Sequence, residues 1–215
     1  MTKHIKGLIF DLDGVLVTTE HNHFISWKNT AEMLGIPFNE EDNEQLKGIS
    51  REDSLKKILE MGKKTISKEM FNELIVKKNE FYLNSIKEIN QSNLLPGVLS
   101  LLQRANFNGL KCAVGSSSKN ARFILSKLQI DTYFSVIVDG NDVSFPKPNP
   151  EVFIKGAELM GLSPSECIVF EDAKSGVQAA KEGGFTAIGV GNPALIDFVD
   201  SYLPNLNDFS LEEYA

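Results

Sequence analysis

The sequence of 215 residues contains only two cysteines, Cys112 and Cys167, and three histidines. Two cysteines cannot form the network of disulfides that stabilises small secreted domains. Both lie inside short apolar runs, so we expect buried, reduced thiols. A catalytic cysteine is not expected, because it needs an electropositive and partly exposed environment.

Positive charge and long apolar runs are also scarce. Lys and Arg number 22 against 29 Asp and Glu, which gives a net charge of −7. A chain this acidic has no electrostatic reason to bind nucleic acid or an anionic membrane, so we expect neither partner. No signal-peptide region precedes the segment Gly7–Phe10 and no later segment could span a bilayer, so we expect a cytoplasmic protein. Any phosphate ligand would have to be held by a few placed cations.

Hydrophobic residues make up 42% of the chain, enough for a sizeable core. Several short apolar runs predict buried parallel strands, and segments with helical periodicity separate most of them. This alternation is typical of an α/β fold, a doubly wound (Rossmann-like) parallel sheet. The expected strands are Gly7–Phe10, Lys111–Val114, Val136–Val138, Ile168–Phe170 and Ala187–Val190.

The region from about Glu20 to Asn90 interrupts the alternation. It contains no convincing strand, only Lys/Glu-rich amphipathic helices with breaks near residues 35–37, 47–50 and 61–62. The insertion is far longer than the dozen or so residues that a crossover needs. We therefore expect an inserted α-helical cap domain at residues 18–90 and an α/β core domain formed by residues 1–17 and 91–215.

Two of the expected strands end in acidic pairs. Asp11 and Asp13 are two residues apart on an extended segment, so they point to the same side at a strand end where open α/β sheets bind ligands. Glu171 and Asp172 follow another strand. Taken singly, the first pair could be a surface turn and Asp172 a helix N-cap. Together they favour a shared hard cation, and oxygen ligands suit Mg²⁺.

Two further segments could hold an anion. The strand Lys111–Val114 is followed by serines, a lysine and the expected start of a helix, which is typical of a phosphate-binding loop. An ordinary serine N-cap fits the same pattern. Lys147 lies between Pro146 and Pro148, with Pro150 close behind, and these prolines restrict the backbone around it. A solvated loop lysine is the alternative there.

The two acidic pairs, the serine-rich segment and Lys147, taken in their order along the chain, resemble the motifs of the haloacid dehalogenase superfamily of phosphotransferases. The resemblance covers essentially the whole chain. The motifs are Asp11-Leu12-Asp13-Gly14, Ser116, Lys147 in Lys-Pro-x-Pro, and Glu171-Asp172. The segment Glu44–Leu55 further resembles the cap of the β-phosphoglucomutase branch, as do His23–Lys28 and Lys77–Asn79. Thr18-Thr19 and Ser117 depart from the pattern of many relatives, which bears on substrate preference more than on mechanism.

The resemblance implies β-phosphoglucomutase activity, an isomerase reaction between β-D-glucose 1-phosphate and β-D-glucose 6-phosphate. It would proceed through an aspartyl-phosphate and β-glucose 1,6-bisphosphate, which is both intermediate and activator. Asp11 would be the nucleophile and Asp13 the general acid/base. One Mg²⁺ would be held by the side chains of Asp11, Glu171 and Asp172 and by the main-chain carbonyl of Asp13. Lys147 would screen the phosphoryl oxygens.

Substrate contacts are implied from both domains. Ser116 would hold the transferring phosphate, while Arg51 and the end of the Ser116–Asn120 loop would hold the other phosphate of the bisphosphate. The expected phosphate- and substrate-binding residues are His23, Lys47, Gly48, Ile49, Arg51, Lys78, Ser116, Ser117, Ser118, Lys119, Asn120 and Lys147. The expected partner is a small-molecule hexose phosphate, bound by a monomer.

Two other functions remain open at this point. A sugar-phosphate phosphohydrolase would use the same core residues but let water attack the phospho-aspartate. A phospho-accepting signalling domain of the receiver type is also doubly wound with an acidic cluster, although it needs no cap of this size.

Overall fold

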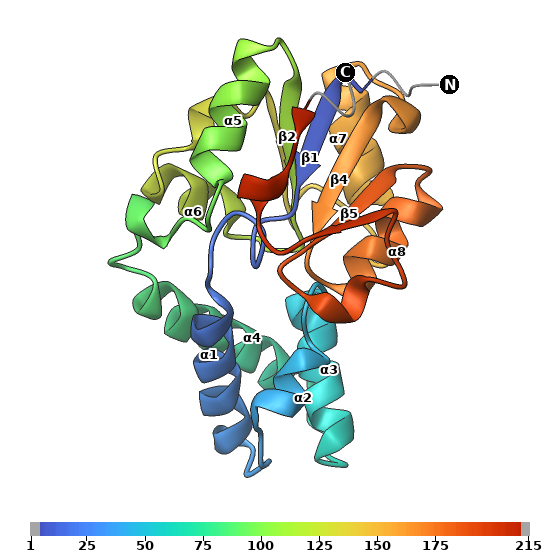
Figure 1. The fold of residues 1–215 in the computed structure, drawn as a ribbon. Helices are drawn as coiled ribbons and strands as arrows, with labels where there is room; N and C mark the ends of the chain where they lie inside the picture. Colours follow the sequence, from blue (N-terminus) through green and yellow to red (C-terminus); the bar gives the residue numbers. More distant parts are fainter. Residues whose placement is uncertain (1–4, 212–215) are drawn as a thin grey trace. The chain divides into compact units, whose positions relative to one another are not determined.

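The structure is a computed structural model and describes residues 5–211. The chain divides into two compact units (Figure 1). One unit comprises the segments up to Thr18 and from Ile89 onward, and the other is Thr19–Glu88.

The first unit contains a six-stranded sheet with the order β3-β2-β1-β4-β5-β6. Every neighbouring pair is parallel. This confirms the predicted α/β, doubly wound fold class. The strands are β1 (Gly7–Phe10), β2 (Lys111–Gly115), β3 (Val136–Val138), β4 (Cys167–Glu171), β5 (Thr186–Val190) and β6 (Ser201–Leu203). The sequence did not predict β6, because this edge strand is short, only half-buried and has no apolar run.

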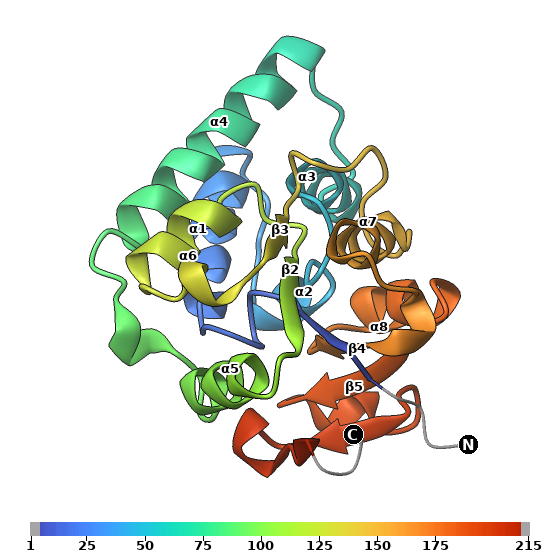
Figure 2. The same ribbon diagram turned by 90° about the horizontal axis from the view of Figure 1, so that it is seen from above.

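Helices cover both faces of the sheet. Figure 2 shows α7 and α8 on one face and α5 on the other. The helices of this unit are α5 (Val98–Phe107), α6 (Ala121–Lys127), α7 (Glu151–Met160) and α8 (Lys174–Glu182). Short 3-10 turns lie at Gln91–Asn93, Asp131–Tyr133, Pro164–Glu166, Pro193–Leu195 and Leu206–Asp208.

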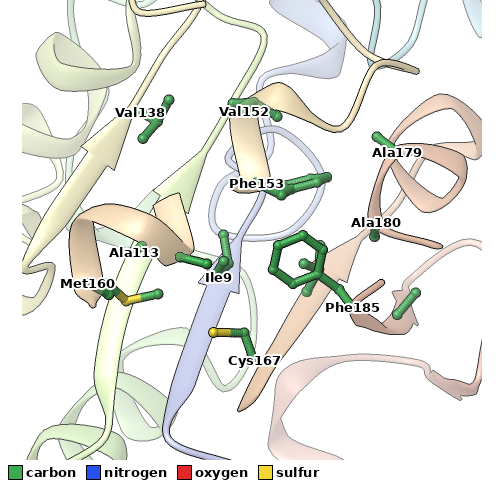
Figure 3. Packing of buried hydrophobic residues seen from close by; sticks show 13 residues of the cluster. Ile9, Ala113, Val138, Val152, Phe153, Met160, Cys167, Ala179, Ala180 and Phe185 are labelled. Atoms are coloured by element: carbon green, nitrogen blue, oxygen red, sulfur yellow. The ribbon is translucent and has the colours of Figure 1, made fainter. Parts of the chain in front are cut away.

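The core between the sheet and these helices is apolar and closely packed. Ile9 of β1 in the middle of the sheet, Phe153 of α7 and Ala180 of α8 belong to one buried apolar cluster (Figure 3). Cys112 and Cys167 are buried free thiols, as predicted, and burial raises the pKa of each to about 12. Both thiols therefore stay protonated at neutral pH and are poor nucleophiles.

The second unit is helical. All residues from 19 to 88 are described, and they form four helices and no strand. The helices are α1 (Glu20–Met33), α2 (Glu40–Glu44), α3 (Arg51–Met61) and α4 (Lys68–Ser85). They end close to the predicted breaks, and the side chain of Ser50 caps α3 by accepting a hydrogen bond from the backbone N–H of Asp53 at 3.1 Å. Trp27 is buried in the apolar core of this unit.

The two ends of the α/β unit that lead into the helical segment lie side by side. Val17 pairs with Leu94 in an antiparallel bridge, and the N–H of Leu95 donates to the carbonyl of Leu16 at 3.1 Å. Among the described residues, no helix combines the length and apolar character needed to cross a membrane.

Candidate active site

The two acidic strand ends meet at the carboxyl edge of the sheet. β1 and β4 are neighbours with Phe10 opposite Phe170, so the next residues along, Asp11 and Glu171, emerge beside each other. The backbone N–H of Asp11 donates to the carbonyl of Phe170 at 3.0 Å, which continues the pairing. Carboxylate oxygens of Asp11, Glu171 and Asp172 all lie within 4.8 Å of one another, and all three residues are buried. The adjacency of β1 and β4 thus builds the cluster.

Lys147 places its ammonium group inside this cluster. Its Nζ donates to Oδ1 of Asp11 at 2.5 Å and to Oε1 of Glu171 at 2.6 Å, and its side chain is fully buried. The ring of Phe153 lies beneath it, 4.6 Å from Nζ to the ring centroid, which adds a cation–π contact. The alternative of a solvated loop lysine is therefore wrong.

The charges of the cluster do not balance. Burial, together with the charges of Glu171 and Asp13, raises the pKa of Asp11 to about 7. The charge of Lys147 lowers this pKa, but by less than the other effects raise it. Burial alone would lower the pKa of Lys147, but the charges of Asp11 and Glu171 outweigh it and raise that pKa. A single ammonium facing three buried carboxylates leaves excess negative charge. Oxygen donors with excess negative charge fit a hard divalent cation.

Close backbone approaches hold the two acids at the end of β4. Oε2 of Glu171 accepts a hydrogen bond from the N–H of Ala173 at 2.9 Å. The backbone at Gly14 has a φ of +81°, and a Cβ there would lie 2.1 Å from Oδ2 of Asp172, so this turn requires glycine. The N-cap of α8 is Ala173, with no side-chain cap hydrogen bond. The alternative of Asp172 as a helix cap is therefore wrong.

Gly176, in the first turn of α8, packs directly against Glu171. A Cβ at Gly176 would lie 1.7 Å from Oε1 of Glu171, the oxygen that binds Lys147. We expect Gly176→Ala to push this carboxylate from its partners and to lower the free energy of unfolding by about 2–4 kcal/mol. Urea titration measures this.

Gly156→Ala in α7 is the matched control for this prediction. A Cβ at Gly156 would make only ordinary contacts, 3.7 Å from Ile9. It should therefore leave stability unchanged or raise it by up to about 1 kcal/mol. Equal effects of the two substitutions would show that contact with Glu171 is not what excludes a side chain at Gly176.

Asp13 lies two residues beyond Asp11 and is only half-buried. Its backbone pairs with Val17 in a bridge, and the N–H of Gly14 donates to the carbonyl of Val17 at 2.8 Å. The Asp13 charge is among those that raise the pKa of Asp11, so the two carboxylates are close. The position suits a group that exchanges protons with a ligand near Asp11.

The loop Ser116–Asn120, here called the serine loop, follows β2 at the same edge of the sheet. The N–H of Ser116 donates to the carbonyl of Val138 at 3.0 Å, and its Oγ accepts from the N–H of Ser118 at 3.1 Å. Oγ of Ser118 accepts in turn from the N–H of Asn120 at 3.2 Å. Asn120 is the N-cap of α6, so the alternative of an ordinary serine N-cap is wrong. The hydroxyls organise the loop itself.

Two predicted residues of the helical unit come together. Nζ of Lys78 lies 3.0 Å from Nδ1 of His23 and 4.8 Å from the ring centroids of both Trp27 and Tyr82. Lys78 is buried. Fifty-five residues separate Lys78 from His23 in the sequence, and only the packing of α1 against α4 makes them neighbours.

The other predicted residues of the helical unit lie around the turn before α3. Arg51 is the first residue of α3 and is half-buried, which lowers the pKa of its guanidinium. Lys47 forms ion pairs with Glu20 at 3.0 Å and Glu44 at 2.8 Å. Gly48 has a φ of +74°, and Ile49 packs against the core of this unit.

Sequence reasoning did not single out two residues that support the cluster. Nδ2 of Asn192 donates to the carbonyl of Asp172 at 2.9 Å, and Phe153 lies under Lys147. Asn192 belongs to a glycine-containing polar segment after β5, which is the neighbour of β4. Its place after a strand of the sheet could have marked it as a candidate site residue. Phe153 is an apolar helix residue with no signal of its own.

A sequence profile described as haloacid dehalogenase-like hydrolase matches residues 8–190. The chain belongs to this family. The motif-based resemblance is thereby confirmed, and family membership leaves the signalling-domain alternative without support.

The similarities of this family member to individual proteins are extensive. It is 39% identical over 212 residues to β-phosphoglucomutase of Bacillus subtilis strain 168, which covers 97% of this chain and 93% of that protein. The crystal structure of β-phosphoglucomutase from Clostridium difficile matches with a TM-score of 0.94 and 36% identity, over 98% of this chain and 97% of that one. Phosphorylated carbohydrates phosphatase of Thermotoga maritima is 30% identical, over 86% of this chain and 84% of that protein.

Proposed function

We propose that this enzyme is a β-phosphoglucomutase, which interconverts β-D-glucose 1-phosphate and β-D-glucose 6-phosphate. The observation that carries the proposal is the buried cluster of Asp11, Lys147 and Glu171. Phosphoryl transfer to a carboxylate requires this combination of a nucleophile and neutralising charge. The similarity to β-phosphoglucomutases extends over nearly the full length, and the identity of 39% to the Bacillus subtilis enzyme exceeds the 30% to the Thermotoga maritima phosphatase, which supports a mutase in particular.

The residues present fit one Mg²⁺ ion. The carboxylates of Asp11, Glu171 and Asp172 would hold it, together with the main-chain carbonyl of Asp13. The ion would supply positive charge that reduces the repulsion between a phosphate group and the carboxylate that attacks it.

In each half-reaction, Asp11 exchanges a phosphoryl group with a sugar oxygen. A carboxylate oxygen of Asp11 attacks phosphorus while the bond to the sugar oxygen breaks, and Asp13 gives a proton to that departing oxygen. In the reverse direction, Asp13 takes the proton from the attacking hydroxyl. Lys147 orients Asp11 through Oδ1 and offsets charge on the transferring group. The hydroxyl of Ser116 holds that group.

The complete cycle transfers one phosphate to the sugar and recovers another. Phospho-Asp11 donates to the 6-hydroxyl of β-glucose 1-phosphate, which forms β-glucose 1,6-bisphosphate. The bisphosphate reorients and returns its 1-phosphate to Asp11, which releases glucose 6-phosphate. We assign the role of a cap to the helical unit: it covers the substrate, excludes water and brings Arg51, His23 and Lys78 to the sugar phosphate.

The test compares α- and β-glucose 1-phosphate side by side, with a trace of glucose 1,6-bisphosphate and Mg²⁺. The proposal predicts glucose 6-phosphate from the β anomer alone, with little inorganic phosphate. Stoichiometric release of inorganic phosphate without isomerisation would contradict it and favour a sugar-phosphate phosphohydrolase, the kind of activity named for the Thermotoga maritima relative.

Arg51→Ala separates the two activities. A mutase must hold its bisphosphate by the phosphate that is not reacting, and a guanidinium fork suits this task. We expect isomerisation of β-glucose 1-phosphate to fall by about 10²-fold or more, because a charge-assisted contact to phosphate is lost. Labelling of Asp11 by acetyl phosphate should change little.

Lys56→Ala is the matched control for Arg51→Ala. It removes an exposed cation from the same helix, one that pairs with Asp53 at 2.8 Å, and both activities should be retained. If Arg51→Ala isomerises within about threefold of the parent, which is less than about 1 kcal/mol, Arg51 does not grip the intermediate.

A further inference from the structure

The turn that follows β3 contacts the serine loop that follows β2. Nδ2 of Asn141 donates to the carbonyl oxygen of Lys119 at 3.1 Å and to Oδ1 of Asp139 at 3.0 Å. The same Oδ1 accepts from the backbone N–H of Asn141 at 2.8 Å. Asp139 is buried, whereas Asn141 is exposed. The buried carboxylate therefore fixes the direction of an exposed amide that reaches across to Lys119.

The turn is also anchored by side chains from outside the serine loop. Nη2 of Arg122 in α6 donates to the carbonyl of Ile137 at 2.6 Å and to Oδ2 of Asp142 at 3.1 Å. Its Nε lies 3.3 Å from Oδ2 of Asp139. Nζ of Lys155 in α7 donates to the carbonyl of Asp142 at 2.7 Å. These contacts make the turn a fixed support from which Asn141 can hold another segment.

The two ends of the serine loop are held by different means. Ser116 continues the pairing of β2 with β3 through its N–H and the carbonyl of Val138, at 3.0 Å, so the sheet places it. At the other end, the side chain of Asn141 holds the carbonyl of Lys119, and the backbone N–H of Gly140 donates to the carbonyl of Ser118 at 3.4 Å. A change at Asn141 should therefore move the Lys119 end and leave Ser116 in place.

We propose that Asn141 is a positioning residue for the second phosphate of a sugar bisphosphate, acting through the Ser118–Asn120 half of the serine loop. This inference rests on the proposed function, in which that half of the loop binds the phosphate that is not reacting. The transferring phosphate depends on Ser116 and Lys147 instead. Asn141 thus affects bisphosphate binding without affecting the chemistry at Asp11.

The test uses Asn141→Asp in the full-length enzyme. The substitution preserves size but removes the donor, and it places a carboxylate against the Lys119 carbonyl and the Asp139 carboxylate. We expect glucose 1,6-bisphosphate to compete at least about fivefold less well against labelling of Asp11 by acetyl phosphate, in keeping with the loss of a hydrogen bond. Its KM as an activator of isomerisation should rise by the same factor. The labelling rate without bisphosphate should stay within about twofold of the parent.

Two further variants sharpen the comparison. Asn141→Ala removes the donor without adding charge and should shift the competition in the same direction by a smaller factor. Asn108→Asp is the matched control, because this exposed side chain donates to the carbonyl of Arg104 at 2.8 Å at the end of α5. It loses the same kind of bond and adds the same charge, and it should leave both labelling and competition unchanged.

Two results would overturn the inference. Competition by the bisphosphate within about twofold of the parent would show that Asn141 does not position the loop. An equal loss of labelling and competition would show that it supports the whole site and not one phosphate. The competition assay does not require isomerisation. A parent enzyme that only hydrolyses sugar phosphates would therefore contradict the proposed function, while the competition would still show whether Asn141 positions the loop.

Discussion

Asp11→Asn should form no detectable phosphoenzyme and should not isomerise β-glucose 1-phosphate. An amide cannot attack phosphorus, and it lacks the charge that a bound Mg²⁺ requires from this position. The variant should nevertheless fold, since it removes one of three carboxylates buried within 4.8 Å of each other. Incubation with labelled acetyl phosphate, followed by acid quenching, measures the phosphoenzyme. Substantial labelling of Asp11→Asn would exclude Asp11 as the nucleophile.

The same variant should be more stable than the parent in EDTA, and the difference should depend on pH. Burial raises the pKa of Asp11 to about 7 from an ordinary value of 3.8. The protonated carboxyl thus stabilises the folded parent below about pH 4, and this contribution is lost as the pH rises through about 7. Asparagine cannot ionise and avoids the loss.

The gain in unfolding free energy from Asp11→Asn should therefore be small near pH 4.5 and larger at pH 8. Urea titrations at both values measure it, and Asp131→Asn is the control, because it removes a carboxylate from an exposed position. An identical difference at both pH values would contradict a raised pKa for Asp11.

Lys147→Met should cause the largest loss of stability among the site variants. The lysine is fully buried and contacts Asp11 at 2.5 Å and Glu171 at 2.6 Å, so its removal leaves both carboxylates without their cation. Breaking a buried ion pair by removing one partner costs about 3–5 kcal/mol. Phosphoenzyme formation should fall by about 10²-fold or more, because charge stabilisation at the phosphoryl group is lost.

Urea titration in EDTA, repeated with excess Mg²⁺, measures the stability of Lys147→Met. The divalent ion should restore part of the loss, because it supplies positive charge to the same carboxylates. Lys155→Met removes a lysine of α7 that donates only to the Asp142 carbonyl among its described contacts, and it should cost about 1 kcal/mol or less. Loss of less than about 1 kcal/mol in Lys147→Met would contradict the buried ion-pair cluster.

The strands of the core could be predicted because a parallel sheet is buried on both faces. Such strands are continuous apolar runs, and the predicted Gly7–Phe10 and Val136–Val138 agree with the structure residue for residue. The edge strand β6, Ser201–Leu203, has no such run because it is only half-buried. The helical insertion could be predicted from the breaks between its helices.

The acidic cluster could be predicted because each of its members lies at the end of a strand, just after one or in a proline-rich loop. The contacts that support the cluster and the serine loop could not be predicted. Asn141 reaches Lys119 only because β2 and β3 are neighbours, and Gly176 meets Glu171 only through the entry angle of α8. These contacts depend on loop geometry that no local pattern encodes. Lys47, predicted as a substrate contact, lies in the turn after α2 and pairs with Glu20 of α1, a contact that also depends on the packing of distant segments.

The fate of the phosphoryl group on Asp11 distinguishes a mutase from a phosphohydrolase. The enzyme is labelled at Asp11 with ³²P from acetyl phosphate, freed of donor and chased with unlabelled β-glucose 1-phosphate. A mutase transfers the label to the 6-hydroxyl, so the proposed function predicts ³²P in glucose 1,6-bisphosphate and then in glucose 6-phosphate. Label recovered only as inorganic phosphate, at a rate that β-glucose 1-phosphate does not change, would contradict it.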